Sequence, residues 1–227
     1  MNKRLILYVE GLTEQIFVDR MLRHHLTGHG VKVERPILAA RTPDPDGPRG
    51  GFTNWPAMEA DLRDLFMGDA DANLRFTTLL DLYAMPPGVP GRPGVFGASS
   101  SAGETDAIES EIAAVLCEPR FVPYLQQHEF EALLLSHPPA LATIFPGHVA
   151  EINSLAADVA GFTTPEDIDH GRNTHPGARI AKAIPEYYDL KASNGFWAAA
   201  EIGLDAMRAA CPRFHKWLGR WEAWGAV

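Results

Sequence analysis

Short apolar runs alternate with segments of helical periodicity over the first 130 residues. The first run, residues 5–9, is continuously apolar, which predicts a strand buried on both faces, as in a parallel sheet. Residues 13–26 carry apolar side chains at helical spacing, and Gly28 and Gly30 follow as stop signals. The chain is therefore predicted to begin with a strand, a tight turn and a helix.

The same alternation continues along the chain. Proline- and glycine-rich stretches at 41–52 and 85–97 predict loops. Thr53 or Asn54 can cap a helix that has Pro56 in its first turn. Strands alternating with helices predict an α/β fold with a mostly parallel sheet and helices on both faces. The further predicted strands are 31–40, 76–81 and 121–125, and the further predicted helices run to residue 66 and over 104–116.

After Glu129 the pattern is helical only, which predicts a C-terminal helical extension packed against the sheet. We expect an α/β domain over residues 1–136 and the extension over 137–227, and the two parts can equally form one domain. A loop is predicted at 161–177 and helices at 195–210 and 213–224. Trp217, Trp221 and Trp224 lie at helical spacing, which favours core packing over an exposed docking surface.

Composition narrows the classes of protein to consider. The chain has 227 residues, 46% of them hydrophobic, which is typical of a globular protein. Its net charge of -9 argues against non-specific electrostatic binding to nucleic acid or to an anionic membrane. No apolar run approaches the roughly 20 residues that cross a bilayer, and no signal peptide is recognisable, so we expect a cytoplasmic location. Cys117 and Cys211 are expected to be buried core thiols.

Acidic residues collect where the predicted strands end. Glu10 closes the first strand, Asp81 closes the third, and Glu129 and Glu131 follow the fourth; Glu14 lies one helical turn beyond Glu10. In a parallel sheet, ligands bind beyond the carboxyl ends of the strands. Several carboxylates at one edge repel each other unless a cation lies between them, and oxygen ligands favour Mg²⁺ or Mn²⁺. The sequence therefore predicts a metal site.

Simpler interpretations of these acids stay open. Glu10, Glu14, Glu129 and Glu131 can each complement the dipole of a following helix without any metal. Asp81 is harder to explain in this way, because an ionised carboxylate that ends a buried strand needs a partner.

Cationic residues are the expected contacts for phosphate. Arg49 precedes two glycines, whose backbone N–H groups can approach an anion closely. Arg179 is a second candidate from the later part of the chain. The alternative for Arg49 is a solvated loop without a binding role.

Four stretches of the sequence carry a resemblance to a known family. Residues 9–14, Val-Glu-Gly-Leu-Thr-Glu, resemble the opening motif of Toprim nucleases of the overcoming-lysogenization-defect (OLD) group. With residues 81–83, 124–134 and 211–218, nearly the whole chain resembles domain of unknown function 4276 (DUF4276), a Toprim-like family.

The resemblance implies a Toprim fold in which Glu10 and an Asp-x-Asp pair hold Mg²⁺ for phosphoryl transfer. Asp81 matches the first aspartate, but Tyr83 stands at the second position, so full two-metal catalysis is in doubt. Glu14, Glu129 and Glu131 are the candidates for the missing oxygens. Related nucleases also bring a lysine from the later part of the chain to the site, and Lys191 is the candidate here.

Two functions of different classes follow from the resemblance. The first is a Mg²⁺- or Mn²⁺-dependent nuclease that cleaves DNA or RNA and works in defence against phage or mobile elements. The family is often encoded beside an ABC-type or related ATPase, and this chain has no Walker A motif, so ATP hydrolysis is expected from such a partner. The second is a non-catalytic Toprim-like subunit that binds or regulates a partner, which Tyr83 and the acidic pI favour. The oligomeric state is left open.

Overall fold

A parallel sheet forms the centre of the molecule. The computed structural model describes residues 3–39, 54–83, 85–86, 88–92, 102–168, 171 and 173–226. The main strand order is β2-β1-β4-β5, and every pairing among the described strands is parallel, which confirms the predicted α/β fold class. The strands are β1 (Lys3–Val9), β2 (Val31–Val33), β3 (Ile37–Leu38), β4 (Leu74–Asp81), β5 (Phe121–Val122) and β6 (Leu125–Gln126).

Prolines divide two of the predicted strands. Pro36 separates β2 from β3, which both pair with β1, and Pro123 separates β5 from β6, which both pair with β4. Proline has no N–H to donate to the ladder, so the pairing is interrupted at each proline and resumes beyond it. The second interruption matters for the site, because β6 carries the chain to the carboxyl end of β4.

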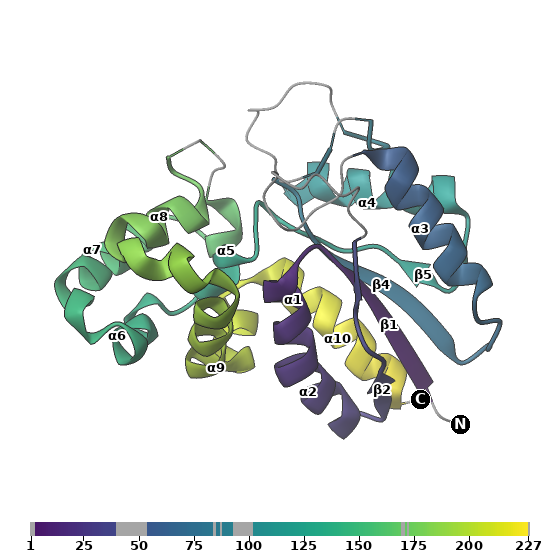
Figure 1. Cartoon of the computed structure of the whole chain (residues 1–227), viewed down its shortest axis with the longest axis horizontal. Helices are drawn as coiled ribbons and strands as arrows, with labels where there is room; N and C mark the ends of the chain where they lie inside the picture. Colours follow the sequence, from purple (N-terminus) through teal and green to yellow (C-terminus); the bar gives the residue numbers. More distant parts are fainter. Residues whose placement is uncertain are drawn as a thin grey trace.

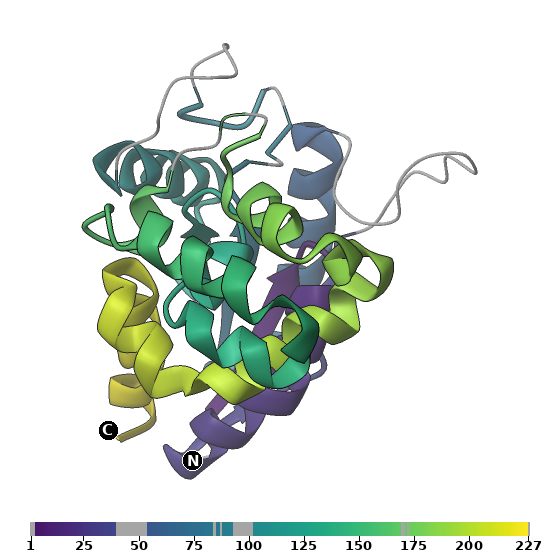
Figure 2. The same cartoon turned by 90° about the vertical axis from the view of Figure 1, so that its left-hand side faces the viewer.

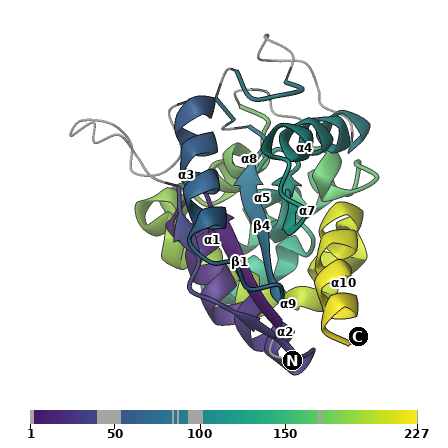
Figure 3. The ribbon, with the colours of Figure 1, turned by 90° about the vertical axis from the view of Figure 1, so that its right-hand side faces the viewer.

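Helices cover both faces of the sheet (Figures 1 and 3). One face packs against α1 (Leu12–Phe17), a π-helical turn η1 (Val18–Leu22) and α2 (Arg23–Gly28), which form one continuous helical segment. The other face packs against α3 (Trp55–Met67) and α4 (Ala102–Leu116). The side chain of Asn54 accepts a hydrogen bond from the Ala57 N–H at 2.9 Å, which confirms it as the cap of α3.

The rest of the chain is helical, as predicted (Figure 2). Helix α9 packs against α1 and α5, and α10 returns to the sheet beside β2.

The loop predicted at 161–177 contains a 3-10 turn, and its last two residues belong to α8. The sequence analysis missed the start of this helix. The division at residue 136 stays a prediction. The elements are α5 (Glu131–Leu134), η2 (Pro138–Ala140), α6 (Leu141–Ile144), η3 (Pro146–His148), α7 (Val149–Val159), η4 (Pro165–Asp167), α8 (Pro176–Ala183), η5 (Pro185–Leu190), α9 (Lys191–Ala210) and α10 (Pro212–Ala226).

The helices of the described residues include none that is both long and apolar enough to span a bilayer.

The tryptophan stripe of α10 faces the sheet. Trp217 and Trp221 are buried, which confirms core packing for both. The Trp217 ring stacks on Tyr124 with centroids 4.6 Å apart, and its Nε1 donates a hydrogen bond to Thr77 Oγ1 at 3.0 Å. Cys211 is buried as expected, but the expectation for Cys117 is wrong: this residue follows the end of α4, beyond its apolar stripe, and is exposed.

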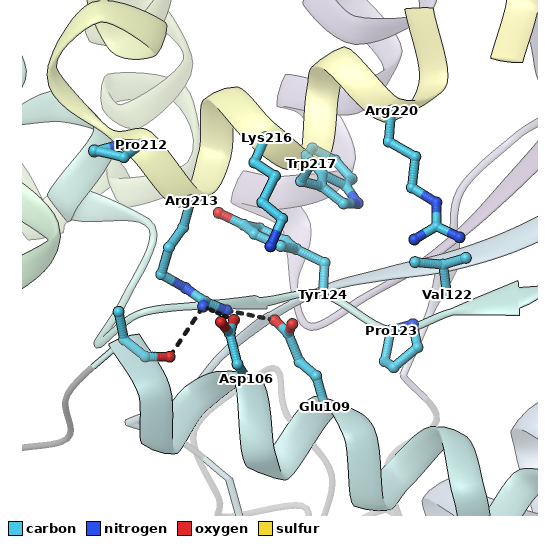
Figure 4. A pocket seen from close by; sticks show the side chains of 11 residues that line it. Asp106, Glu109, Val122, Pro123, Tyr124, Pro212, Arg213, Lys216, Trp217 and Arg220 are labelled. Carbon is cyan, nitrogen blue, oxygen red and sulfur yellow. Dashed lines mark hydrogen bonds and ion pairs between the residues drawn. The ribbon is translucent and has the colours of Figure 1, made fainter. Parts of the chain in front are cut away.

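Arg213 links the helices on the two faces of the sheet around the β5 edge. Figure 4 shows its guanidinium reaching from α10 to Asp106 and Glu109 on α4, and the Glu109 contact is 2.6 Å. Burial raises the pKa of Glu109 to about 7, against the opposing effect of Arg213. Lys216 and Arg220 extend from the same helix over a cavity of about 520 Å³ between α4 and α10. The last helix is therefore held to both layers of the fold.

We predict that Thr77→Val lowers the free energy of unfolding by about 1–3 kcal/mol, because it leaves the Trp217 indole N–H buried without its acceptor. Urea denaturation measures this loss. Thr77→Ser is the control, since it keeps the hydroxyl and removes one methyl group, at a cost of about 0.8 kcal/mol. If the valine variant loses no more stability than the serine variant, the hydrogen bond does not hold α10 to the sheet.

Candidate metal centre

Glu10 and Asp81 lie side by side where two adjacent parallel strands end. Val9 pairs with Leu79, so the residues that follow emerge at the same edge of the sheet. Glu10 Oε2 accepts a hydrogen bond from the Asp81 N–H at 3.0 Å, and Asp81 Oδ1 accepts one from the Phe130 N–H at 2.8 Å. Backbone groups therefore fix both carboxylates in place.

Glu14 lies in the first turn of α1 and points back toward this edge. Its Oε2 accepts a hydrogen bond from the Gly11 N–H at 2.9 Å, so it also serves the helix start, as one of the simpler interpretations anticipated. The side chain is nevertheless buried. An ordinary helix-capping glutamate is exposed, so burial marks Glu14 as part of the acidic site.

Glu129 is held at the amino end of α8. Its Oε1 lies 2.7 Å from His175 Nδ1 and accepts a hydrogen bond from the Gly177 N–H. A Cβ at residue 177 would lie 2.9 Å from that same oxygen and 2.5 Å from the Tyr188 hydroxyl, so only glycine allows this approach. The hydrogen bond with Glu129 raises the pKa of His175, although burial opposes it.

Glu131 is fully buried, and only one of its two carboxylate oxygens has a polar partner among the described residues. Its Oε1 accepts a hydrogen bond from the Tyr187 hydroxyl at 2.9 Å and lies 3.0 Å from Lys191 Nζ. Its Oε2 is buried and has no hydrogen-bond partner among the residues that the structure describes. A buried carboxylate oxygen without a partner carries a substantial desolvation cost, which a cation at this position would offset.

Three carboxylates converge at this point. Asp81, Glu129 and Glu131 each offer one oxygen, and these oxygens all lie within 4.8 Å of one another. The orphaned oxygen of Glu131 and the all-oxygen donor set fit a hard divalent cation. This buried cluster can therefore bind a metal ion, with Glu10 and Glu14 beside it.

Burial and mutual repulsion make the ionised forms of Glu10, Glu14 and Asp81 unfavourable, and their pKa values are raised. Burial, and then repulsion by Glu14, raises the pKa of Glu10 to about 7, and burial raises that of Glu14 to about 6. Burial and the neighbouring glutamates raise the pKa of Asp81 well above its usual range. Burial alone would lower the pKa of Lys191, but the attraction of Glu131 and Asp81 outweighs it and raises that pKa. Lys191 is thus a fixed cation in this site.

Residues other than the predicted acids and Lys191 also contribute to this site. Tyr83 stacks on His175 with ring centroids 5.3 Å apart, and His175 in turn contacts Glu129, so Tyr83 supports the site indirectly. Tyr187 and Gly177 were missed. The His-Pro-Gly sequence at 175–177 is a helix-start pattern, which could have indicated free N–H groups there.

Of the two predicted phosphate contacts, only Arg179 lies in the part of the chain that the structure describes. Arg49 lies outside the described residues. Arg179 donates from Nε to the Thr174 carbonyl oxygen at 2.6 Å and lies over the Phe162 ring at 5.1 Å, so its guanidinium is engaged away from the carboxylates. Their roles stay predictions.

We predict that, without divalent metal, the protein loses stability as pH rises from about 4.5 to about 7. The folded pKa values of Glu10 and Glu14 lie above the ordinary 4.5, so the folded chain binds more protons than the unfolded chain across this window. Denaturant midpoints measured across the window test this. Glu10→Gln should flatten the slope and the exposed Glu201→Gln should not; equal slopes in all three proteins would contradict the electrostatic account.

Comparisons with known proteins place the chain in a family. Two crystal structures of the C-terminal region of the OLD protein of Xanthomonas campestris pv. campestris are similar to it, at 12% and 16% identity. Each similarity covers 96% of this chain and 97% of that region, with a TM-score of 0.38. No curated protein matches the chain. The sequence model of the family described as domain of unknown function (DUF4276) matches residues 9–222, and the chain therefore belongs to this family.

Proposed function

We propose that the protein is a divalent-metal-dependent phosphodiester hydrolase that acts on nucleic acid. The observation that carries the proposal is the buried, unpartnered Oε2 of Glu131, a residue whose carboxylate clusters with those of Asp81 and Glu129. We assign these three residues as the ligands of Mg²⁺ or Mn²⁺, because hard oxygen donors suit these ions. When bound, the ion would supply charge stabilisation at the scissile phosphate and activation of water.

Glu10 is the proposed general acid or base. In the metal-free protein, burial raises its pKa to about 7, close to neutral pH, where a carboxyl group can both take up and return a proton. The Asp81 N–H holds one of its oxygens, which fixes the orientation of the carboxyl group toward the site. Glu14 stands beside it, and its charge helps to keep that pKa high.

Lys191 is the proposed phosphate contact. Its ammonium stays charged because Glu131 and Asp81 attract it, and it lies 3.0 Å from Glu131. A cation fixed beside the metal ligands can stabilise negative charge that develops on a phosphate oxygen. Arg49 and Arg179 remain further candidates for phosphate binding.

The finer assignment that we propose is a Toprim-type nuclease related to the OLD group. Glu10, Glu14 and Asp81 occupy the positions that the sequence motif requires, and Glu129 and Glu131 supply carboxylates where Tyr83 does not. We further propose that it acts in defence against phage or mobile DNA with an ABC-type or related ATPase. The acidic chain has little general affinity for nucleic acid, so such a partner would contribute the binding surface.

A second candidate is a non-catalytic Toprim-like subunit. The observation that favours it is the contact between Lys191 and Glu131, because the ammonium already neutralises part of the acidic cluster. Tyr83 also removes one expected ligand and packs against His175 instead. In this case the site would have a structural role and would bind divalent ions weakly or not at all.

We predict that Glu131→Gln weakens Mn²⁺ binding by at least tenfold. The substitution keeps an oxygen that can accept from Tyr187 and removes the negative charge that attracts the ion. Isothermal titration calorimetry measures the affinity, with Glu201→Gln on the exposed side of α9 as the control. Unchanged Mn²⁺ affinity in a folded Glu131→Gln variant would remove Glu131 from the metal centre.

We also predict that the isolated chain cleaves plasmid DNA and RNA slowly in Mg²⁺ or Mn²⁺, and that its ATPase partner accelerates cleavage. Asp81→Asn should abolish cleavage in both settings, because it removes a proposed metal ligand. Strong cleavage by the chain alone would contradict the dependence on a partner. If no combination cleaves either substrate and Mn²⁺ does not bind, the non-catalytic subunit is the correct function.

A further inference from the structure

We infer a second metal site, separate from the acidic cluster, where His25, His29 and Glu222 bind Zn²⁺. His25 lies in α2, His29 caps its carboxyl end, and Glu222 lies in α10. These elements meet beside the start of β2, whose Val31 pairs with Lys3 at the amino end of β1. The acidic cluster follows the opposite end of β1, roughly 20 Å away for a strand of this length, so neither site depends on the other.

The three ligand atoms already converge. His25 Nε2 lies 2.6 Å from Glu222 Oε1, and His29 Nε2 lies 4.0 Å from the same oxygen. One ligand atom from each residue falls within a group that spans at most 4.8 Å. Zinc bonds of about 2.0–2.2 Å to nitrogen and oxygen place tetrahedral ligands at comparable separations. A bound ion would take the place of the direct contact between His25 and Glu222.

Backbone contacts fix the end of α2 against the end of α10. Gly225 packs so closely on His29 that a Cβ at residue 225 would overlap the His29 carbonyl oxygen. Gly30 has φ of 81° and ends the helical segment against the Gly225 carbonyl. Lys3 Nζ donates to the carbonyl oxygen of Trp224. The positions that carry His29 and Glu222 are therefore set by main-chain packing before any ion binds.

The surroundings of Glu222 suit a metal ligand. Arg208 contacts both of its oxygens, Nη1 to Oε1 at 2.5 Å and Nη2 to Oε2 at 2.9 Å. Ligating carboxylates are commonly oriented by such a partner on the second oxygen. We assign Oε1 to the ion and Oε2 to Arg208, so the ion displaces the Nη1 contact. The Arg208 charge lowers the affinity below that of an unopposed site.

The donor set selects the class of metal. Two imidazole nitrogens and one carboxylate oxygen favour Zn²⁺ among biologically common ions, whereas Mg²⁺ prefers oxygen ligands alone. The His29 side chain is 44% exposed, so solvent reaches the site and water can complete the coordination. A bound ion would link the end of α2 to the end of α10. His25 and Glu222 are 197 residues apart in the sequence.

The test is a Zn²⁺ titration by calorimetry in excess Mg²⁺, which competes for the oxygen ligands of the acidic cluster but not for the histidines. We expect one Zn²⁺ site in the wild type that His29→Ala weakens by at least tenfold. His24→Ala is the matched control, since His24 is an exposed neighbour on the same helix and should leave the affinity unchanged. Substitution by Co²⁺ should give the visible absorption bands of a tetrahedral site in the wild type and in His24→Ala.

Glu222→Gln tests the third ligand, with circular dichroism to check the fold, because this change also weakens the contacts with His25 and Arg208. His29→Ala serves as the second probe, since removing a half-exposed side chain leaves the core intact. Absence of Zn²⁺ binding in the wild type would overturn the inference. So would Zn²⁺ binding that survives both substitutions unchanged, or that His24→Ala abolishes equally.

Discussion

The contact between Lys191 and Glu131 is the interaction on which the acidic site depends. Glu131 is fully buried, and one of its oxygens has no partner among the described residues, so its ionised form needs a nearby cation. Lys191 supplies that charge at 3.0 Å. Because Glu131 begins α5, shortly after β6, and Lys191 begins α9, the same contact fastens α9 to α5 beside the carboxyl edge of the sheet.

The other carboxylates are positioned by main-chain groups. Each accepts a hydrogen bond from one backbone N–H group: Asp81 from Phe130, Glu10 from Asp81, Glu14 from Gly11, and Glu129 from Gly177. Main-chain donors are fixed by the fold, so the acids cannot swing apart to relieve their repulsion. Burial, with this repulsion added to it, raises the pKa values of Glu10, Glu14 and Asp81, and a divalent cation would offset the repulsion.

The sheet was predictable because its apolar runs and strand-end acids are local patterns. Continuous apolarity in residues 5–9 identified β1, and the glutamate that follows it pointed to the edge where the structure brings the carboxylates together. The divisions at Pro36 and Pro123 were not anticipated, although proline gives a physical reason for both. Tertiary packing of α8 and η5 brings three further residues to the site: His175, Gly177 and Tyr187. They follow the acids that they contact by 46, 48 and 56 residues, respectively. Periodicity carries no information about such contacts.

The central claim is that Asp81, Glu129 and Glu131 enclose a divalent cation. The most direct measurement is the anomalous diffraction of a crystal of the protein grown with Mn²⁺. The account predicts one manganese peak within bonding distance of an oxygen from each of these three carboxylates, including the Glu131 oxygen that is unpartnered here. A fully occupied manganese elsewhere, with this Glu131 oxygen still unpartnered, would contradict it.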